Sequence, residues 1–197
     1  MIGVKRVFII HGWDGYPEEG WFPWLKRELE TRGFNVSIPA MPDSRHPTIS
    51  AWVSHVRHEV GVPDGQTFLV GHSIGAQAII RYLEGLWAYE KIGRAVFVAG
   101  WVTLAHAAYE EEGDEETAKP WLEMPIDWEK VKSRANGFAA IFSDNDPFVP
   151  LADVEVFRQR LNAGIMIEHN KGHFSGSDGV TELPSALNAV LKHAQTT

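Results

Sequence analysis

Short runs of apolar residues alternate along this chain with longer segments in which apolar residues recur every three or four positions. Val, Ile and Phe dominate the short runs, and Gly, Pro, Asn or Asp bound them, which predicts β-strands. The predicted strands are residues 4–10, 34–38, 67–70, 95–99, 137–142 and 165–167. Several of these runs are continuous rather than alternating, a pattern that indicates a sheet covered on both faces.

The longer segments predict helices, namely residues 21–29, 49–60, 76–86, 128–133, 151–161 and 183–191. Pro23 fits the first turn of the first helix and Gly33 follows its end, while Thr48 or Ser50 could cap the second. Strands that alternate with helices predict an α/β fold, a three-layer α/β/α sandwich around a mostly parallel six-stranded sheet. The length of 197 residues fits a single domain, residues 1–197.

Residues 101–127 interrupt this alternation, because they separate the fourth strand from the next predicted helix by a long stretch. Its middle is an acidic cluster made up of Glu110, Glu111, Glu112, Asp114, Glu115 and Glu116. A solvated loop or a frayed helix is the favoured interpretation. The alternative is a flap or insert over a site at the strand ends, in which three side chains would cover a ligand: Trp101, Trp121 and Met124.

The composition narrows the classes of function. Lys and Arg number 18 against 26 Asp and Glu, a net charge of −8, which argues against nucleic acid as a partner because phosphate binding needs a basic surface. Cysteine is absent, which excludes disulfides, thiolate nucleophiles and zinc sites with Cys ligands. No stretch reaches the ~18 consecutive apolar residues of a membrane helix, and no signal peptide is visible. A soluble cytoplasmic protein is the expectation.

The strongest local signal is Gly-His-Ser-Ile-Gly at residues 71–75, which follows a predicted strand and precedes a predicted helix. A nucleophile elbow, the sharp turn that raises a serine hydroxyl above a sheet, requires that setting. Glycines flank the serine because side chains there would collide with the neighbouring strand or helix. The free amides at the start of the helix favour developing negative charge. Ser73 is therefore the candidate nucleophile, and a structural turn is the alternative.

A serine hydroxyl is a poor nucleophile without a base. In serine hydrolases built on an α/β sheet, the chain order is Ser, then Asp or Glu, then His, each after a strand. Here the candidates are Asp144 or Asp146, followed by His169 or His173. We favour Asp146, whose loop can point back across the strand ends, whereas Asp144 could cap or brace the loop. We favour His173 because the preceding glycine lets the loop aim the ring, whereas His169 lies near the strand end.

The loop His11-Gly12-Trp13 follows the first strand and is expected to complete an oxyanion hole. The donors would be the main-chain N–H of Ile74 and one N–H from Gly12 or Trp13. His11 is interpreted as a positioning residue, and the His72 side chain is expected to point away from the serine. Core packing is an open alternative for the three candidate walls of an apolar substrate pocket, which are Trp13, Trp101 and Phe148.

The sequence predicts chemistry without a metal or an organic cofactor. The glycines at residues 71–75 are not followed by the Lys-Ser/Thr pair of a phosphate-binding loop, and no dinucleotide-binding fingerprint is present. His55 and His58 have a helical spacing that can bind metal, but no third ligand is evident, so a solvated helix face is favoured.

Several short segments together carry a family resemblance that runs through most of the chain: HGW at 11–13, W-x-x-W-L-K-R-E-L at 21–29, MPD at 41–43, GHSIGA at 71–76, DWEKVK at 127–132, SDNDPFVP at 143–150 and GHF at 172–174. They resemble the small serine hydrolases of the retinoblastoma-binding protein 9 type, within the α/β-hydrolase superfamily. The resemblance implies a minimal α/β-hydrolase fold, an esterase- or peptidase-like activity and a triad of Ser73, Asp146 and His173. The retinoblastoma-binding segment L-x-C-x-E needs a cysteine, so that partner is not carried over.

These interpretations combine into an expected function. The chain would be a serine hydrolase that cleaves small carboxylic esters or amides through an acyl-enzyme on Ser73, with a small-molecule acyl substrate as its partner. The alternatives are a catalytically silent small-molecule or protein binding module on the same fold, and an acyltransferase that uses an alcohol in place of water. Neither nucleic acid nor a membrane is an expected partner, and the sequence does not indicate an oligomeric state.

Overall fold

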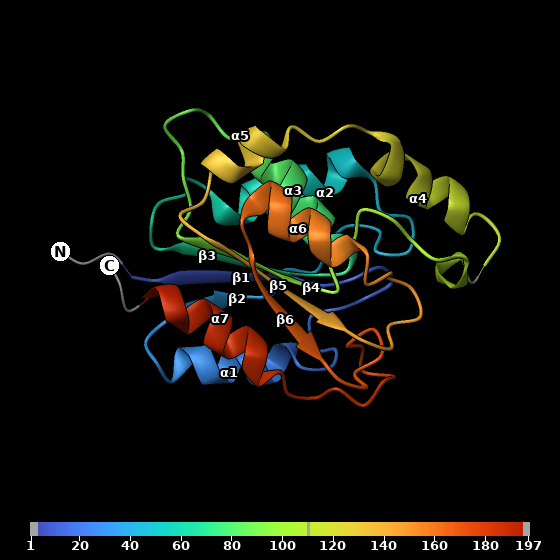
Figure 1. The fold of residues 1–197 in the computed structure, drawn as a ribbon. Coiled ribbons are helices and arrows are strands. Elements are labelled where there is room, and N and C mark those ends of the chain that lie inside the picture. Colours follow the sequence, from blue (N-terminus) through green and yellow to red (C-terminus); the bar gives the residue numbers. More distant parts are fainter. Residues whose placement is uncertain (1–3, 110, 195–197) are drawn as a thin grey trace.

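Six parallel strands form one sheet in the computed structural model, which describes residues 4–109 and 111–194. Their order across the sheet is β2-β1-β3-β4-β5-β6 (Figure 1). The strands are β1 (Arg6–Ile10), β2 (Asn35–Ser37), β3 (Thr67–His72), β4 (Arg94–Val98), β5 (Phe138–Ser143) and β6 (Gly164–Glu168). Each overlaps one of the runs predicted from the sequence, and the predicted parallel α/β sheet is confirmed.

Helices cover both faces of the sheet and complete the three layers (Figure 1). One face carries α1 (Phe22–Glu30) and α7 (Pro184–Ala194), which contact each other. The other face carries α2 (Ile49–Val60), α3 (Ile74–Glu84), α5 (Trp128–Ser133) and α6 (Asp153–Leu161). The 3₁₀ helix η1 (His106–Ala108) and α4 (Asp114–Glu123) lie toward the end of the molecule to which the strands run. In the described ranges, no helix is long and apolar enough to cross a bilayer.

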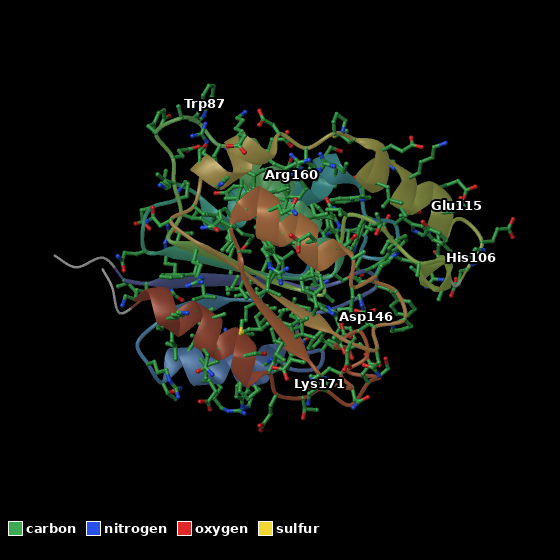
Figure 2. All side chains as sticks on the ribbon, in the orientation of Figure 1. Trp87, His106, Glu115, Asp146, Arg160 and Lys171 are labelled. Atoms are coloured by element: carbon green, nitrogen blue, oxygen red, sulfur yellow. The ribbon has the colours of Figure 1, made fainter. Side chains whose placement is uncertain are left out.

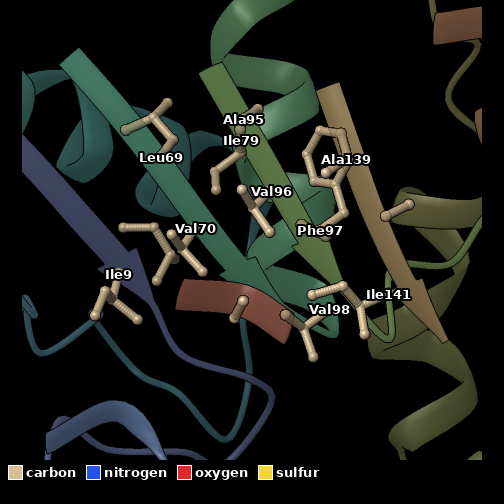
Figure 3. Close-up of a cluster of buried hydrophobic side chains, with 14 of the residues drawn as sticks. Ile9, Leu69, Val70, Ile79, Ala95, Val96, Phe97, Val98, Ala139 and Ile141 are labelled. Atoms are coloured by element: carbon tan, nitrogen blue, oxygen red, sulfur yellow. The ribbon is translucent and has the colours of Figure 1, made fainter. Parts of the chain in front are cut away.

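The central strands are buried at every position, because a helical layer lies over each face of the sheet. Figure 3 shows part of this core, in which Val70, Val96 and Ile141 from three neighbouring strands belong to one apolar cluster. Burial of each such side chain contributes about 1.5–3 kcal/mol to stability. The sheet is therefore a rigid support for the loops that leave its carboxyl edge.

The observed helices match the predicted ones with shifts at their starts. Thr48, and not Ser50, caps α2, since its hydroxyl oxygen accepts the N–H of Ala51 at 3.4 Å. The predicted helix from residue 76 begins two residues earlier, at Ile74. The predicted helix from residue 151 begins at Asp153, after a turn.

The acidic stretch of residues 101–127 contains a helix with a buried anchor. Asp114, Glu115 and Glu116 occupy the first turn of α4, where the helix dipole favours negative charge, and Glu110 lies outside the described residues. Trp121 holds this helix to the fold, because its indole N–H donates to the carbonyl of Pro47 at 2.9 Å. The segment is thus neither a plain solvated loop nor frayed throughout, and its role as a flap stays a prediction.

The strands β1 and β3 are neighbours in the sheet, and the chain leaves their carboxyl ends in opposite directions. From β1 the chain passes to β2 at one edge, returns to β3 and continues toward β6. Ligands of open α/β sheets bind at such a switch point. Gly75 lets α3 pack against the end of β1, since a Cβ there would lie 2.4 Å from the carbonyl oxygen of Ile10 and 2.6 Å from that of His11.

We expect Gly75→Ala to lower the free energy of unfolding by about 3 kcal/mol, because the added methyl group pushes α3 away from β1. An Ala in a helix is ordinarily about 1 kcal/mol more stable than a Gly, so the sign of the change reports the contact. Urea unfolding followed by circular dichroism measures it. Gly65→Ala is the matched control, since a Cβ at Gly65 meets nothing within 4 Å. Equal stability of the two variants would contradict the prediction.

Candidate active site

Ser73 stands at the turn between β3 and α3 with a strained main chain. Its φ of 52° and ψ of −121° lie in a region that residues with a side chain rarely adopt. Its N–H donates to the carbonyl of Val98 on β4 at 2.9 Å, which fixes the turn to the sheet. A Cβ at Gly71 would lie 2.7 Å from the main chain of Gly75, so the strand and the helix meet too closely for larger residues. These are the features expected of a nucleophile elbow.

His173 and Asp146 come together from the loops after β6 and β5. The Nδ1 of His173 lies 2.9 Å from Oδ2 of Asp146, whose side chain is 2% exposed. The other carboxylate oxygen of Asp146 accepts the N–H groups of Phe148 at 2.8 Å and Val149 at 3.0 Å. An ionised carboxylate only accepts hydrogen bonds, so Nδ1 carries the proton and Nε2 remains free to act as a base. Figure 2 shows Asp146 at the carboxyl end of the sheet.

Asp144 and His169, the two alternatives, pair with each other at the surface. Nδ1 of His169 lies 2.5 Å from Oδ2 of Asp144, and the His169 side chain is 80% exposed. The hydrogen bond from His169 lowers the pKa of Asp144, and the same bond raises the pKa of His169. Oδ1 of Asp144 also accepts the N–H of Asn170 at 2.9 Å. Asp144 therefore braces the loop, the alternative role that its sequence position suggested.

Two further side chains of the β5 loop hold the main chain of the β6 loop. The hydroxyl oxygen of Ser143 accepts the N–H of Lys171 at 3.0 Å, and Oδ1 of Asn145 accepts the N–H of Gly172 at 2.9 Å. Ser143 also donates to Asn145 at 2.8 Å. Figure 2 shows Lys171 near the same end of the molecule as Asp146. The two loops are thus joined residue by residue, which fixes where His173 stands.

Ser73 and His173 line one cavity of about 300 Å³. Within the described residues no hydrogen bond joins the Ser73 hydroxyl to the His173 ring, and such bonds commonly tighten only when substrate binds. The three aromatic residues predicted as walls line this cavity, namely Trp13, Trp101 and Phe148. The ring of Phe148 meets that of His173 edge to face at 5.0 Å. Trp101 is only 1% exposed, so it packs in the core and also lines the cavity.

The mouth of the cavity carries charged side chains. One cation, Arg45, pairs with Asp14 at 3.4 Å and with Glu111 of the 101–127 segment. Glu19 lines the same cavity, and burial raises the pKa of its carboxyl. The segment before α2 and the acidic segment are therefore tied together beside the cavity.

The predicted oxyanion donors surround the Ser73 turn. Ile74 is the first residue of α3, so its N–H has no acceptor within the helix. A Cβ at Gly12 would lie 3.4 Å from the Cβ of Ser73, which shows how closely the β1 loop approaches. Behind this loop, Nε2 of His11 accepts the N–H of Met41 at 3.0 Å, which leaves Nδ1 to donate to the carbonyl of Gly12 at 2.9 Å. Burial lowers the pKa of His11, which suits a neutral positioning residue.

His55 and His58, the pair with metal-binding spacing, lie on α2 beside Glu59. Nε2 of His55 lies 4.0 Å from a carboxylate oxygen of Glu59. Across residues 4–109 and 111–194, no three His, Asp or Glu side chains are grouped so that they could hold a metal ion.

His72 makes a contact in this site that the sequence did not predict. It is buried, and its Nε2 lies 2.7 Å from the carbonyl oxygen of His173, so it contacts the loop of the candidate base. The two residues are 101 positions apart, and no local pattern predicts such a contact.

Known proteins resemble the chain over nearly its whole length. It is 31% identical over 203 residues to YdeN of Bacillus subtilis (strain 168), which covers 96% of each chain. It is 30% identical over 182 residues to the serine hydrolase RBBP9 of Rattus norvegicus, which covers 90% of this chain and 91% of that one.

Solved structures share the fold. The crystal structure of the ydeN gene product from B. subtilis is similar with a TM-score of 0.89 and 27% identity, and covers 98% of this chain and all of its own. Est1E from Butyrivibrio proteoclasticus has the same fold at 15% identity, with a TM-score of 0.74 over 96% of this chain and 89% of its own. A family model described as serine hydrolase matches residues 7–192. The chain therefore belongs to the serine hydrolase family and is a hydrolase with the α/β-hydrolase fold.

Proposed function

We propose that this hydrolase cleaves small carboxylic esters or amides through an acyl-enzyme formed on Ser73. The observation that carries the proposal is the His173 ring, which is bonded to buried Asp146 through Nδ1 and shares one cavity with Ser73. A histidine held in this tautomer is the base that a serine nucleophile requires. A binding protein that does no chemistry has no use for this arrangement.

The acylation step uses His173 first as a base and then as an acid. Nε2 takes the proton of the Ser73 hydroxyl while the serine oxygen bonds to the carbonyl carbon of the substrate. Asp146 keeps the Nδ1 proton in place and stabilises the imidazolium that forms. The imidazolium then gives its proton to the leaving alcohol or amine, and the acyl group stays on Ser73 as an ester. Water, deprotonated by the same Nε2, releases the acid and restores the hydroxyl.

The oxyanion of the tetrahedral intermediate is to be held by main-chain amides. The N–H of Ile74 and one from Gly12 or Trp13 are the proposed donors, each worth about 3 kcal/mol in the transition state. Support comes from the position of Ile74 at the helix start and from the close approach of Gly12 to Ser73. His11 bonds the carbonyl of Gly12 and thereby orients this loop.

The size of the cavity supports a small substrate. Its volume of about 300 Å³ is at the lower end of the range of roughly 300–1,000 Å³ found for small-molecule sites. Trp13, Trp101 and Phe148 supply apolar walls, which suit the hydrocarbon part of an acyl or leaving group.

Ser73→Ala is expected to abolish turnover of p-nitrophenyl acetate and covalent labelling by a fluorophosphonate, because no other group takes the place of the hydroxyl. Absorbance at the nitrophenolate band and mass spectrometry measure the two effects, with circular dichroism to verify the fold. Ser54→Ala is the matched control, since Ser54 is an exposed residue of α2. Labelling of Ser73→Ala at the level of the unaltered protein would remove Ser73 from the role.

Asp146→Asn is expected to lower kcat by about 10⁴-fold, because the amide favours the wrong tautomer of the His173 ring. Asp144→Asn keeps an oxygen for the N–H of Asn170, so we expect a loss of less than about tenfold, the size of a weakened surface contact. Steady-state ester hydrolysis at neutral pH gives both values. Equal losses at the two positions would refute the choice of Asp146.

A further inference from the structure

Three polar groups of His173 are engaged by separate partners. Its N–H donates to Oδ2 of Asp178 at 2.9 Å, its carbonyl lies 2.7 Å from Nε2 of His72, and its ring Nδ1 bonds Asp146. This leaves Nε2, the nitrogen that the proposed mechanism uses. The partners differ in origin, because Asp146 and Asp178 belong to the loops after β5 and β6, whereas His72 belongs to the elbow itself.

The chemistry of the contact fixes the state of His72. A carbonyl oxygen only accepts hydrogen bonds, so Nε2 of His72 carries the proton and donates it. Burial lowers the pKa of His72 to about 3, and the ring is therefore neutral over the range in which such hydrolases are assayed. Nδ1 is then the bare nitrogen, and within the described residues it has no hydrogen-bond partner. One hydrogen bond defines the orientation of this ring.

Aromatic neighbours keep the His72 ring from turning. Trp21 and Phe22, at the start of α1, meet its edge at centroid distances of 6.2 Å and 5.9 Å. Trp21 also donates its indole N–H to the carbonyl of Phe174 at 3.0 Å, the residue directly after His173. The β1 loop also packs closely against the ring, since a Cβ at Gly12 would lie 2.9 Å from Nδ1 of His72.

We propose that His72 is a positioning residue for the reaction, which holds the main chain of His173 at a fixed distance from Ser73. Because His72 and Ser73 share a peptide bond, the link from nucleophile to base consists of one covalent step and one hydrogen bond. This inference rests on the proposed function, since it assigns His72 a role in setting the serine–histidine geometry. A shift of about 1 Å at such a geometry can lower a rate a hundredfold.

The test compares His72→Leu, which removes the donor, with His72→Gln, whose amide nitrogen extends about as far as Nε2. Stopped-flow bursts with p-nitrophenyl acetate give the acylation rate constant, and fluorophosphonate labelling counts the functional sites. We expect His72→Leu to lower the rate constant per labelled site by about a hundredfold. The substrate concentration that gives half of the maximal burst rate, which reports binding, is expected to change less than about threefold, because His72 acts on a step after binding. His72→Gln is expected to recover at least about tenfold of the loss.

Leu83→Ala is the control for a general loss of stability, because Leu83 is buried in the second half of α3. It is expected to lower the melting temperature while the rate constant per site stays unchanged. Should His72→Leu fail to fold, His72→Asn replaces it, because its shorter amide cannot extend to the His173 carbonyl. An acylation rate of His72→Gln no higher than that of the Leu or Asn variant would overturn the role of His72.

The two proposals fail in different ways. Ester turnover that survives Ser73→Ala overturns the proposed function. Turnover that depends on Ser73, together with an acylation rate constant per site that is the same in His72→Leu as in the unaltered enzyme, overturns only the positioning role.

Discussion

The close packing of α3 against the end of β1 at Gly75 governs the geometry around Ser73. Without room for a side chain there, the helix starts directly behind the elbow, and Ser73 takes a strained main-chain conformation with a positive φ. The buried sheet holds Ser73 in this conformation, because the Ser73 N–H donates to the carbonyl of Val98 on β4. The position of the proposed nucleophile is therefore set by main-chain contacts, and side chains would add the chemistry.

His173, the proposed base, is positioned by a different kind of contact. Side-chain oxygens of Ser143, Asp144 and Asn145 accept main-chain N–H groups of the following loop, and Asp146 accepts from His173 itself. Consecutive acceptors on one loop thus match consecutive donors on the other. The loop also needs a glycine at residue 172, because its φ is 54° and a Cβ there would collide with the carboxylate of Asp178. The acceptors of this pairing are supplied by the sequence Ser-Asp-Asn-Asp at residues 143–146.

Patterns within a few residues of sequence predicted much of the fold and of the candidate site. The six strands followed from apolar runs, and the strand–turn–helix setting of Ser73 followed from two glycines. The start of α3 was missed by two residues, because the helix begins on a turn stabilised by packing that no local pattern encodes. For the acidic stretch the sequence favoured a solvated loop or a frayed helix, and it did not predict the buried anchor of α4, since this is the distant contact of Trp121 with Pro47. The His72–His173 bond spans 101 residues and was missed for the same reason.

The order of Ser73 and His173 along the chain determines when a growing polypeptide can become active. During synthesis the elbow emerges first, and His173 and Asp178 emerge about 100 residues after Ser73, followed by α7, which packs against β4 and α1. On the proposed chemistry, a chain arrested before His173 holds the Ser73 turn without its base, and the hydroxyl alone is a poor nucleophile. Premature termination would then yield inert product rather than an indiscriminate esterase.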